Sequence, residues 1–165
     1  MPASRPFPDP YLLEYSAEHL KYEFDMFSWL GRVCGNATVQ IGAPTAADAT
    51  RLNNVLIESF AVHIRNVIDF LYIDTPQPTD VVAADFLPAG AWGKIRPPIS
   101  VTLEAARKRA NKEIAHLTTS RIAGGPPEKG WDFSGLTSEV RPLLQLFVAN
   151  ALGTRCSGAV ADAIQ

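Results

Sequence analysis

The segment from residue 107 to residue 121 holds the side chains of this sequence best suited to acid–base chemistry on a phosphate. It carries five of the fifteen basic residues of the chain and one acid, an excess of four positive charges in a protein of formal net charge −2. A histidine that titrates near neutrality can move protons, while fixed cations stabilise charge that grows on phosphate oxygens. The residues concerned are Arg107, Lys108, Arg109, Lys112, Glu113, His116 and Arg121.

Helical periodicity brings the histidine and two of these cations together. On an α-helix Arg109, Glu113 and His116 fall at positions i, i+4 and i+7, which share one face. Lys112 lies one helical turn before His116. Imidazole, guanidinium and ammonium groups therefore converge, and we expect Lys112 and Glu113 to contact the substrate. This chemistry needs neither a metal ion nor a cofactor.

The run RANKEIAH, residues 109–116, resembles the Arg-x(4–6)-His motif of the HEPN superfamily, the higher eukaryotes and prokaryotes nucleotide-binding domains. The resemblance implies a small all-α bundle. Active members are metal-independent endoribonucleases of toxin or defence type, and they dimerise so that two motifs face each other across a cleft. For this chain the resemblance implies that His116 transfers protons and that Arg109 binds the phosphate and stabilises the transition state. The implied partners are RNA or a nucleotide and a second copy of the chain.

Two other interpretations of the same segment stay open. In the first, residues 107–121 form a solvated basic helix face on which His116 and Glu113 make an ordinary i, i+3 contact. In the second, the chain is a non-catalytic module that binds a nucleotide or a protein. Its aromatic loops, around Trp92 and Trp131, would then be buried against a partner or a second copy.

A second group of polar residues, HIRNVIDF, lies at positions 63–70. His63 falls on an apolar stripe with Phe60 and Val67, so we expect it to point into the bundle. Arg65 and Asp69, at i and i+4, predict a helix-surface ion pair worth a few tenths of a kcal/mol. If this helix packs beside the motif helix, His63 and Arg65 approach His116 and join the candidate substrate-binding residues.

A third group, on the first predicted helix, offers metal-capable side chains. His19 and Glu23 are four residues apart and share a face with Tyr22 and Met26. No Glu-x-x-His pair recurs in the chain, as a di-iron bundle would require. Amphipathic packing explains these residues, and we predict no metal site.

Apolar periodicity and capping signals place these groups on helices. The prolines among residues 1–10 predict a disordered arm, and the small residues among 153–165 predict a frayed tail. Residues 11–152 are predicted to form a single domain. Thr45 and Asp48 form a capping pattern before the longest helix, and Pro142 is expected in the first turn of the last one. Helices are predicted over 11–33, 46–72, 80–86, from 100 or 102 to about 122, and 139–151.

These elements predict an all-α fold, a bundle of four main helices and one short helix with antiparallel neighbours. With 165 residues, 47% of them hydrophobic, the chain is long enough for one domain with a core of its own. Cys34 and Cys156 show no metal-ligand spacing. No apolar run approaches the roughly 20 residues that span a bilayer, and the N-terminus lacks the pattern of a signal peptide. We therefore expect a cytoplasmic protein without a membrane partner.

Overall fold

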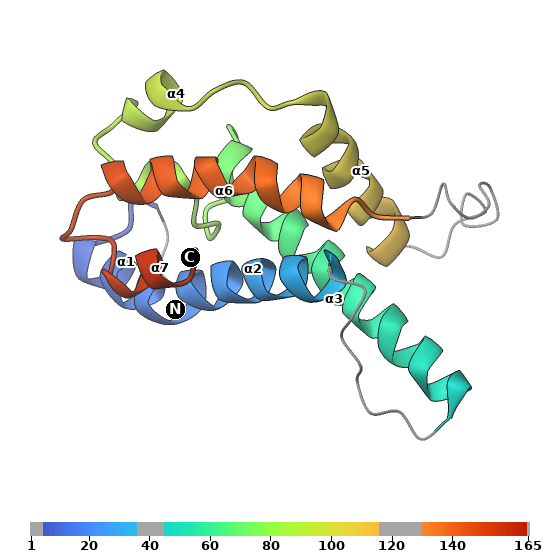
Figure 1. Cartoon of the computed structure of the whole chain (residues 1–165). Helices are drawn as coiled ribbons and strands as arrows, with labels where there is room; N and C mark the ends of the chain where they lie inside the picture. Colours follow the sequence, from blue (N-terminus) through green and yellow to red (C-terminus); the bar gives the residue numbers. More distant parts are fainter. Residues whose placement is uncertain (1–4, 36–44, 116–129, 165) are drawn as a thin grey trace.

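Every regular element in the described part of the chain is helical (Figure 1). The computed structural model describes residues 5–35, 45–115 and 130–164, and of residues 113–115 it describes the helical backbone alone. The predicted all-α class is confirmed. The long elements are α1 (Asp9–Tyr15), the π-helical turn η1 (Ser16–Leu20), α2 (Lys21–Gly35), α3 (Ala46–Tyr72), α5 (Val101–Ala115) and α6 (Phe133–Asn150). The short elements are the 3-10 turn η2 (Ala83–Phe86), α4 (Ala91–Ile95) and α7 (Ala159–Asp162).

The first helical run is longer than the sequence predicted, because it begins at Asp9 and ends at Gly35. Pro10 fits the first turn, where its missing N–H has no helical acceptor in any case. The residues before the helix also depart from the expectation of a disordered arm. Phe7 is buried, and Arg5 Nη2 lies 2.6 Å from Asp85 Oδ1. These two contacts tie residues 5–10 to the rest of the molecule.

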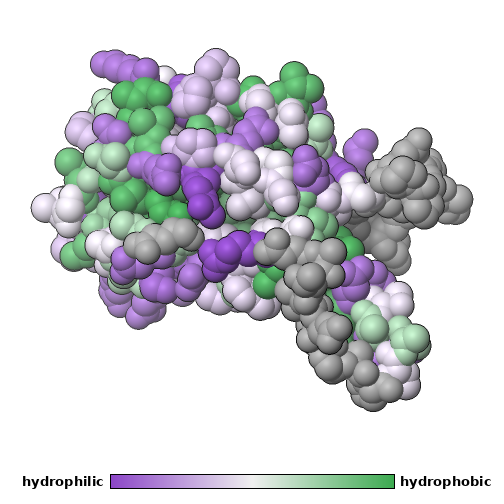
Figure 2. Space-filling view, in the orientation of Figure 1, coloured by the Kyte–Doolittle hydropathy of each residue, from purple (hydrophilic) through white to green (hydrophobic). Residues whose placement is uncertain are grey.

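The longest helix, α3, spans the residues that its apolar stripe and capping pattern predicted. Thr45 Oγ1 accepts a hydrogen bond of 3.1 Å from the backbone N–H of Asp48, which confirms the cap. The buried residues of α3 begin only at Phe60. The preceding half of the helix therefore stands out from the bundle, as Figures 1 and 2 show.

Contacts between α2 and its neighbours establish the predicted antiparallel order. The ring of Phe24 meets Phe70 of α3, whereas Phe27, one turn later, meets the earlier residue Phe60, each at 5.7 Å between centroids. The same order holds against α6, because Phe24 contacts Phe147 whereas Gly31, two turns later, faces the earlier residue Thr137. α3 also packs against α5, so α3 lies between the N-terminal helices and the motif helix (Figure 1).

Aromatic rings fill the centre of the hydrophobic core. Phe147 of α6 makes edge-to-face contacts with four rings from four different segments, at centroid distances of 5.0–6.2 Å. Each such pair adds about 0.5–1.5 kcal/mol to the free energy gained by burial. The cluster therefore joins segments that lie far apart in the sequence. Its four rings are Phe24, Phe70, Phe86 and Trp92.

The last long helix begins six residues earlier than predicted, so the expected position of Pro142 in a first turn is wrong. The Asp132 carboxylate accepts a hydrogen bond of 2.8 Å from the Gly135 N–H and starts α6 there. Phe133 then packs on Phe60, 4.9 Å between ring centroids. Pro142 lies inside the helix, where it cannot donate to the Ser138 carbonyl one turn earlier.

The C-terminal tail is more ordered than predicted, and the segment 80–100 differs from the prediction in its helical elements. The predicted helix at 80–86 is reduced to η2, and α4 forms between residues 86 and 100, where no helix was predicted. Trp92 Nε1 and Arg96 Nη1 each donate to the Leu71 carbonyl at 2.8 Å, which satisfies an acceptor at the end of α3. In the tail, Val160 is fully buried. The stretch 116–122 of the predicted motif helix lies outside the described residues.

Candidate functional site

The motif helix α5 uses its small and apolar residues to pack against the bundle. Ser100 starts the helix, because its Oγ accepts a 3.0 Å hydrogen bond from the Leu103 N–H. Leu103, Ala106 and Ala110 are buried, and their spacing defines the face turned toward α3. The arginines and lysines of α5 therefore lie on its other sides.

Two of these basic residues are neutralised by neighbouring carboxylates. Arg107 Nε lies 2.6 Å from Asp69 Oδ1 of α3, and its Nη1 lies 3.8 Å from Glu104 Oε2. Lys108 Nζ lies 3.2 Å from the other oxygen of Glu104. Arg107 and Lys108 therefore both have carboxylate partners within the protein. The Arg107–Asp69 ion pair joins α5 to α3.

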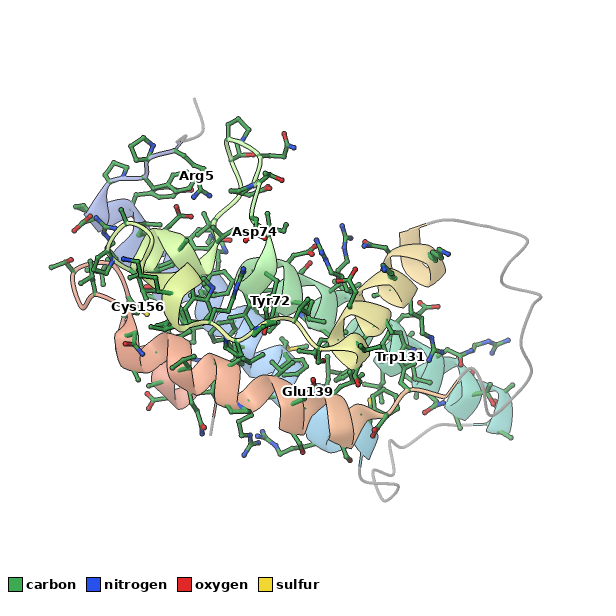
Figure 3. The ribbon with its side chains drawn as sticks, turned by 90° about the horizontal axis from the view of Figure 1, so that it is seen from above. Arg5, Tyr72, Asp74, Trp131, Glu139 and Cys156 are labelled. Atoms are coloured by element: carbon green, nitrogen blue, oxygen red, sulfur yellow. The ribbon has the colours of Figure 1, made fainter. Side chains whose placement is uncertain are left out.

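Arg109 is held against an aromatic ring that sequence reasoning did not connect with it. Its guanidinium carbon lies 4.3 Å from the centre of the Trp131 ring, and its Nη1 donates to the Gly130 carbonyl at 2.7 Å. Trp131 in turn meets Phe60 of α3 edge to face at 6.1 Å. Figure 3 shows Trp131 between α5 and the start of α6. The guanidinium plane of the predicted phosphate-binding arginine is thus fixed by the segment that precedes α6.

The remaining residues of the predicted motif are described only in part. Lys112 is exposed on α5, one turn after Lys108. Glu113 belongs to the helix, but its side chain is not described. His116 lies outside the described residues, directly after the last residue of α5.

His63 points into the bundle, as its place on the apolar stripe predicted, and its contacts are with α2. Its Nδ1 lies 2.8 Å from Glu23 Oε2, and its ring meets Tyr22 edge to face at 5.8 Å. The same carboxylate oxygen accepts a 3.2 Å hydrogen bond from Asn66 Nδ2. α3 does pack beside α5, but the structure turns His63 toward α2.

Arg65 and Asp69 form the predicted i, i+4 pair, at 3.6 Å between Nε and Oδ2. The closer partner of Asp69 is Arg107, so this carboxylate binds one guanidinium from α3 and another from α5. Glu23, Arg65 and Asp69 also line a cleft of about 400 Å³ between η1, α2, α3 and residues 79–82. Burial, and then the nearby Glu23 charge, raise the pKa of Tyr15, which lines the same cleft.

Both tryptophans of the predicted partner-binding loops are used inside this chain, so that interpretation is corrected. Trp92 is buried in the aromatic cluster and donates to the Leu71 carbonyl. Trp131 packs between Phe60 and Arg109. An apolar loop residue can complete its own core, and sequence alone does not distinguish that role from binding a partner. The only hint of the Arg109–Trp131 contact in the sequence was a tryptophan just before the last long helix.

Neither a metal site nor a membrane helix is found in the part of the chain that the structure describes. Within residues 5–35, 45–115 and 130–164, no three histidine, cysteine, aspartate or glutamate side chains are grouped so that they could hold an ion. None of the helices described is both long and apolar enough to cross a membrane.

Comparisons with known proteins identify no relative. No protein-family model, no curated protein and no solved structure matches this chain. The resemblance to the HEPN superfamily therefore rests on the motif residues and on the all-α class.

Proposed function

We propose that this protein binds RNA through the end of α5 and cleaves it as a metal-independent endoribonuclease of HEPN-like kind. Arg109 binds the phosphate at which the RNA is cleaved, Lys112 contacts the RNA beside it, and His116 transfers the proton. The observation that carries the proposal is the fixed position of Arg109, which Trp131 and Gly130 hold one turn from exposed Lys112. An arginine oriented before the substrate arrives loses less conformational freedom on binding it.

The proposed reaction is an internal transesterification. His116 takes the proton of the ribose 2′-hydroxyl, the 2′-oxygen attacks phosphorus, and the bond from phosphorus to the 5′-oxygen breaks. The leaving 5′-oxygen takes up a proton, and the products are a 2′,3′-cyclic phosphate and a 5′-hydroxyl end. Arg109 stabilises the additional negative charge on the phosphate oxygens in the transition state. Arg107 and Lys108 are left out of this step because carboxylates already neutralise them.

Two copies of the chain are expected to bring their motifs together, as the resemblance implies. In this proposal Glu113 contacts substrate or supports His116, and Arg65 flanks the strand from α3. His63 takes no part, because it is buried and bound to Glu23. Analytical ultracentrifugation of the whole chain tests the dimer.

The experiment measures cleavage of a mixed RNA pool in the presence of a chelator. We expect wild type to cut, and His116→Ala and Arg109→Ala each to lose about a hundredfold or more in rate. Arg51→Ala is the matched control, because Arg51 is an exposed arginine that pairs with Asp48 on the projecting half of α3. The control variant should cut at the wild-type rate.

Two results contradict the catalytic proposal. One is a wild-type protein, folded by circular dichroism, that cleaves no RNA. The other is an activity that persists unchanged in both motif variants. RNA binding that depends on Arg109, in the absence of cleavage, supports the alternative of a non-catalytic binding module.

A further inference from the structure

A second cavity, of about 410 Å³, lies between α2 and α6, on elements that the proposed ribonuclease site does not use. Arg32 comes from α2 and Arg141 from α6. Between them the cavity is lined by the hydroxyl-bearing residues Ser134, Thr137 and Ser138 and by two glycines. The lining that the structure describes therefore consists of guanidinium groups, hydroxyl groups and backbone.

The two glycines explain why the hydroxyl groups of α6 lie so near the α2 backbone. A Cβ atom placed on Gly31 would clash with the side chain of Thr137, and one on Gly35 would lie 2.6 Å from Ser134 Oγ. Residues with side chains at these positions would push α6 away. With glycine at both, α2 and α6 approach closely and the two arginines border the same space.

The described lining residues of this cavity include two arginines. None of its described lining residues is acidic. Asp132, which precedes these residues of α6, accepts a hydrogen bond from the Gly135 N–H and caps the helix. Arg141 is half-buried, and no ion pair is found for it among the described residues.

Two serine hydroxyl groups can add hydrogen-bond donors at this cavity. Thr137 Oγ1 donates to the Phe133 carbonyl at 2.7 Å, so its proton is already used. Ser134 and Ser138 are exposed at the cavity, and their hydroxyl protons can turn toward a bound acceptor. Guanidinium groups bind tetrahedral oxyanions through two parallel N–H···O bonds, and hydroxyl groups complete such a shell.

We propose that the cavity between α2 and α6 is a binding site for a phosphate group, held by Arg32, Arg141, Ser134 and Ser138. The phosphate is carried either by a free nucleotide or by an RNA backbone, since both present the same oxygen atoms. The site needs neither Arg109 nor His116. It can therefore stand if the proposed ribonuclease activity fails.

The test is a titration of the whole ¹⁵N-labelled chain, followed by backbone amide shifts at constant ionic strength. Three probes are used: inorganic phosphate, a nucleoside 5′-monophosphate, and an RNA oligonucleotide without terminal phosphates. We expect millimolar inorganic phosphate to shift the amide signals of Ser134 and Ser138. Arg141→Ala should weaken phosphate binding about tenfold or more, and Arg141→Lys should weaken it less.

A second variant keeps the proposal testable if Arg141→Ala does not fold. Ser138→Glu changes an exposed residue and places a carboxylate in the cavity, so it should abolish phosphate binding. Arg51→Ala removes the same charge as Arg141→Ala, far from the cavity in the sequence, and should bind phosphate as wild type does. In Arg109→Ala and His116→Ala, inorganic phosphate should still shift the amide signals of Ser134 and Ser138, which separates this site from the ribonuclease proposal.

Each outcome decides the proposal or its source of phosphate. If the nucleotide binds more tightly than the oligonucleotide, the ligand is a free phosphate monoester, and the reverse order identifies an RNA backbone. In both cases Ser138→Glu must abolish the binding of the tighter probe. The proposal is overturned if no probe shifts Ser134 and Ser138. It is also overturned if phosphate binds equally well to wild type and to Ser138→Glu.

Discussion

The guanidinium carbon of Arg109 lies 4.3 Å from the centre of the Trp131 ring, and that ring meets Phe60 edge to face at 6.1 Å. The three residues come from α5, from the segment before α6, and from α3. Arg109 is therefore positioned by contacts that exist only after these three segments have packed together.

The Arg109–Trp131 contact should be measurable as a coupling energy. In a double-mutant cycle of Arg109→Ala and Trp131→Ala, urea unfolding should give a coupling of about 0.5–1 kcal/mol, as expected for a cation–π contact near the surface. Trp131→Ala alone should lower the free energy of unfolding by roughly 1–3 kcal/mol, because Phe60 loses a packing partner. Trp131→Phe, which keeps an aromatic face, should restore part of both. Additive effects in the cycle would show that Trp131 does not hold Arg109.

The ion pair between α3 and α5 should stabilise the position of the motif helix. Arg107→Ala combined with Asp69→Asn should give a coupling of about 1 kcal/mol, since both side chains are largely shielded from water. The longer Arg65–Asp69 pair should give a smaller coupling, about 0.3 kcal/mol. Equal couplings for the two arginines would contradict the unequal distances of 2.6 and 3.6 Å.

The Glu23 carboxylate should be needed for stability because it satisfies a buried imidazole. Glu23→Ala leaves the Nδ1 of His63 without its partner, and should lower the free energy of unfolding by about 1–3 kcal/mol. Glu58→Ala, on an exposed position of α3, is the control and should change stability by less than about 0.5 kcal/mol. Chemical denaturation of the two variants makes the comparison, and equal effects would refute the role given to Glu23.

The thiol of Cys156 should react slowly at neutral pH. Burial raises its pKa to about 11. At about pH 8 only one thiol in a thousand is then ionised, and the thiolate is the reactive form. The folded state holds this proton more tightly than the unfolded state does, so stability is kept below about pH 9 and falls as the pH rises toward 11. Iodoacetamide labelling followed by peptide mass spectrometry should show Cys156 alkylated slowly in the folded chain and rapidly in urea. Fast labelling of the folded chain at pH 8 would contradict the shift.

Much of the secondary structure could be predicted because its signals are local. The boundaries of α3 follow from the Thr45 cap and an apolar stripe, and both act within a few residues along the chain. The start of α6 was missed because two local signals competed. Pro142 suggested a first turn, but Asp132 offers a cap ten residues earlier and Phe133 gains a contact with Phe60. That contact depends on the fold and leaves no mark in the local pattern.

Less of the candidate site could be predicted. The sequence indicated the Arg65–Asp69 pair and the inward direction of His63, because helical spacing determines both. It could not show that Asp69 binds Arg107 more closely, or that Glu23 is the partner of His63. These pairs join residues 38 and 40 positions apart, and such contacts depend on which helix faces lie together.

Local sequence patterns were enough to predict a helical protein, the position of its longest helix and the gathering of basic residues on one segment. Periodicity and capping carry that information, and both act over distances of a helical turn or two. The packing of the helices determines which of those basic residues pair with carboxylates, what holds Arg109, and that Arg32 and Arg141 border one cavity. Such contacts escape local patterns because a charge is paired or oriented by the side chain that packs beside it. In this fold that neighbour often belongs to another helix.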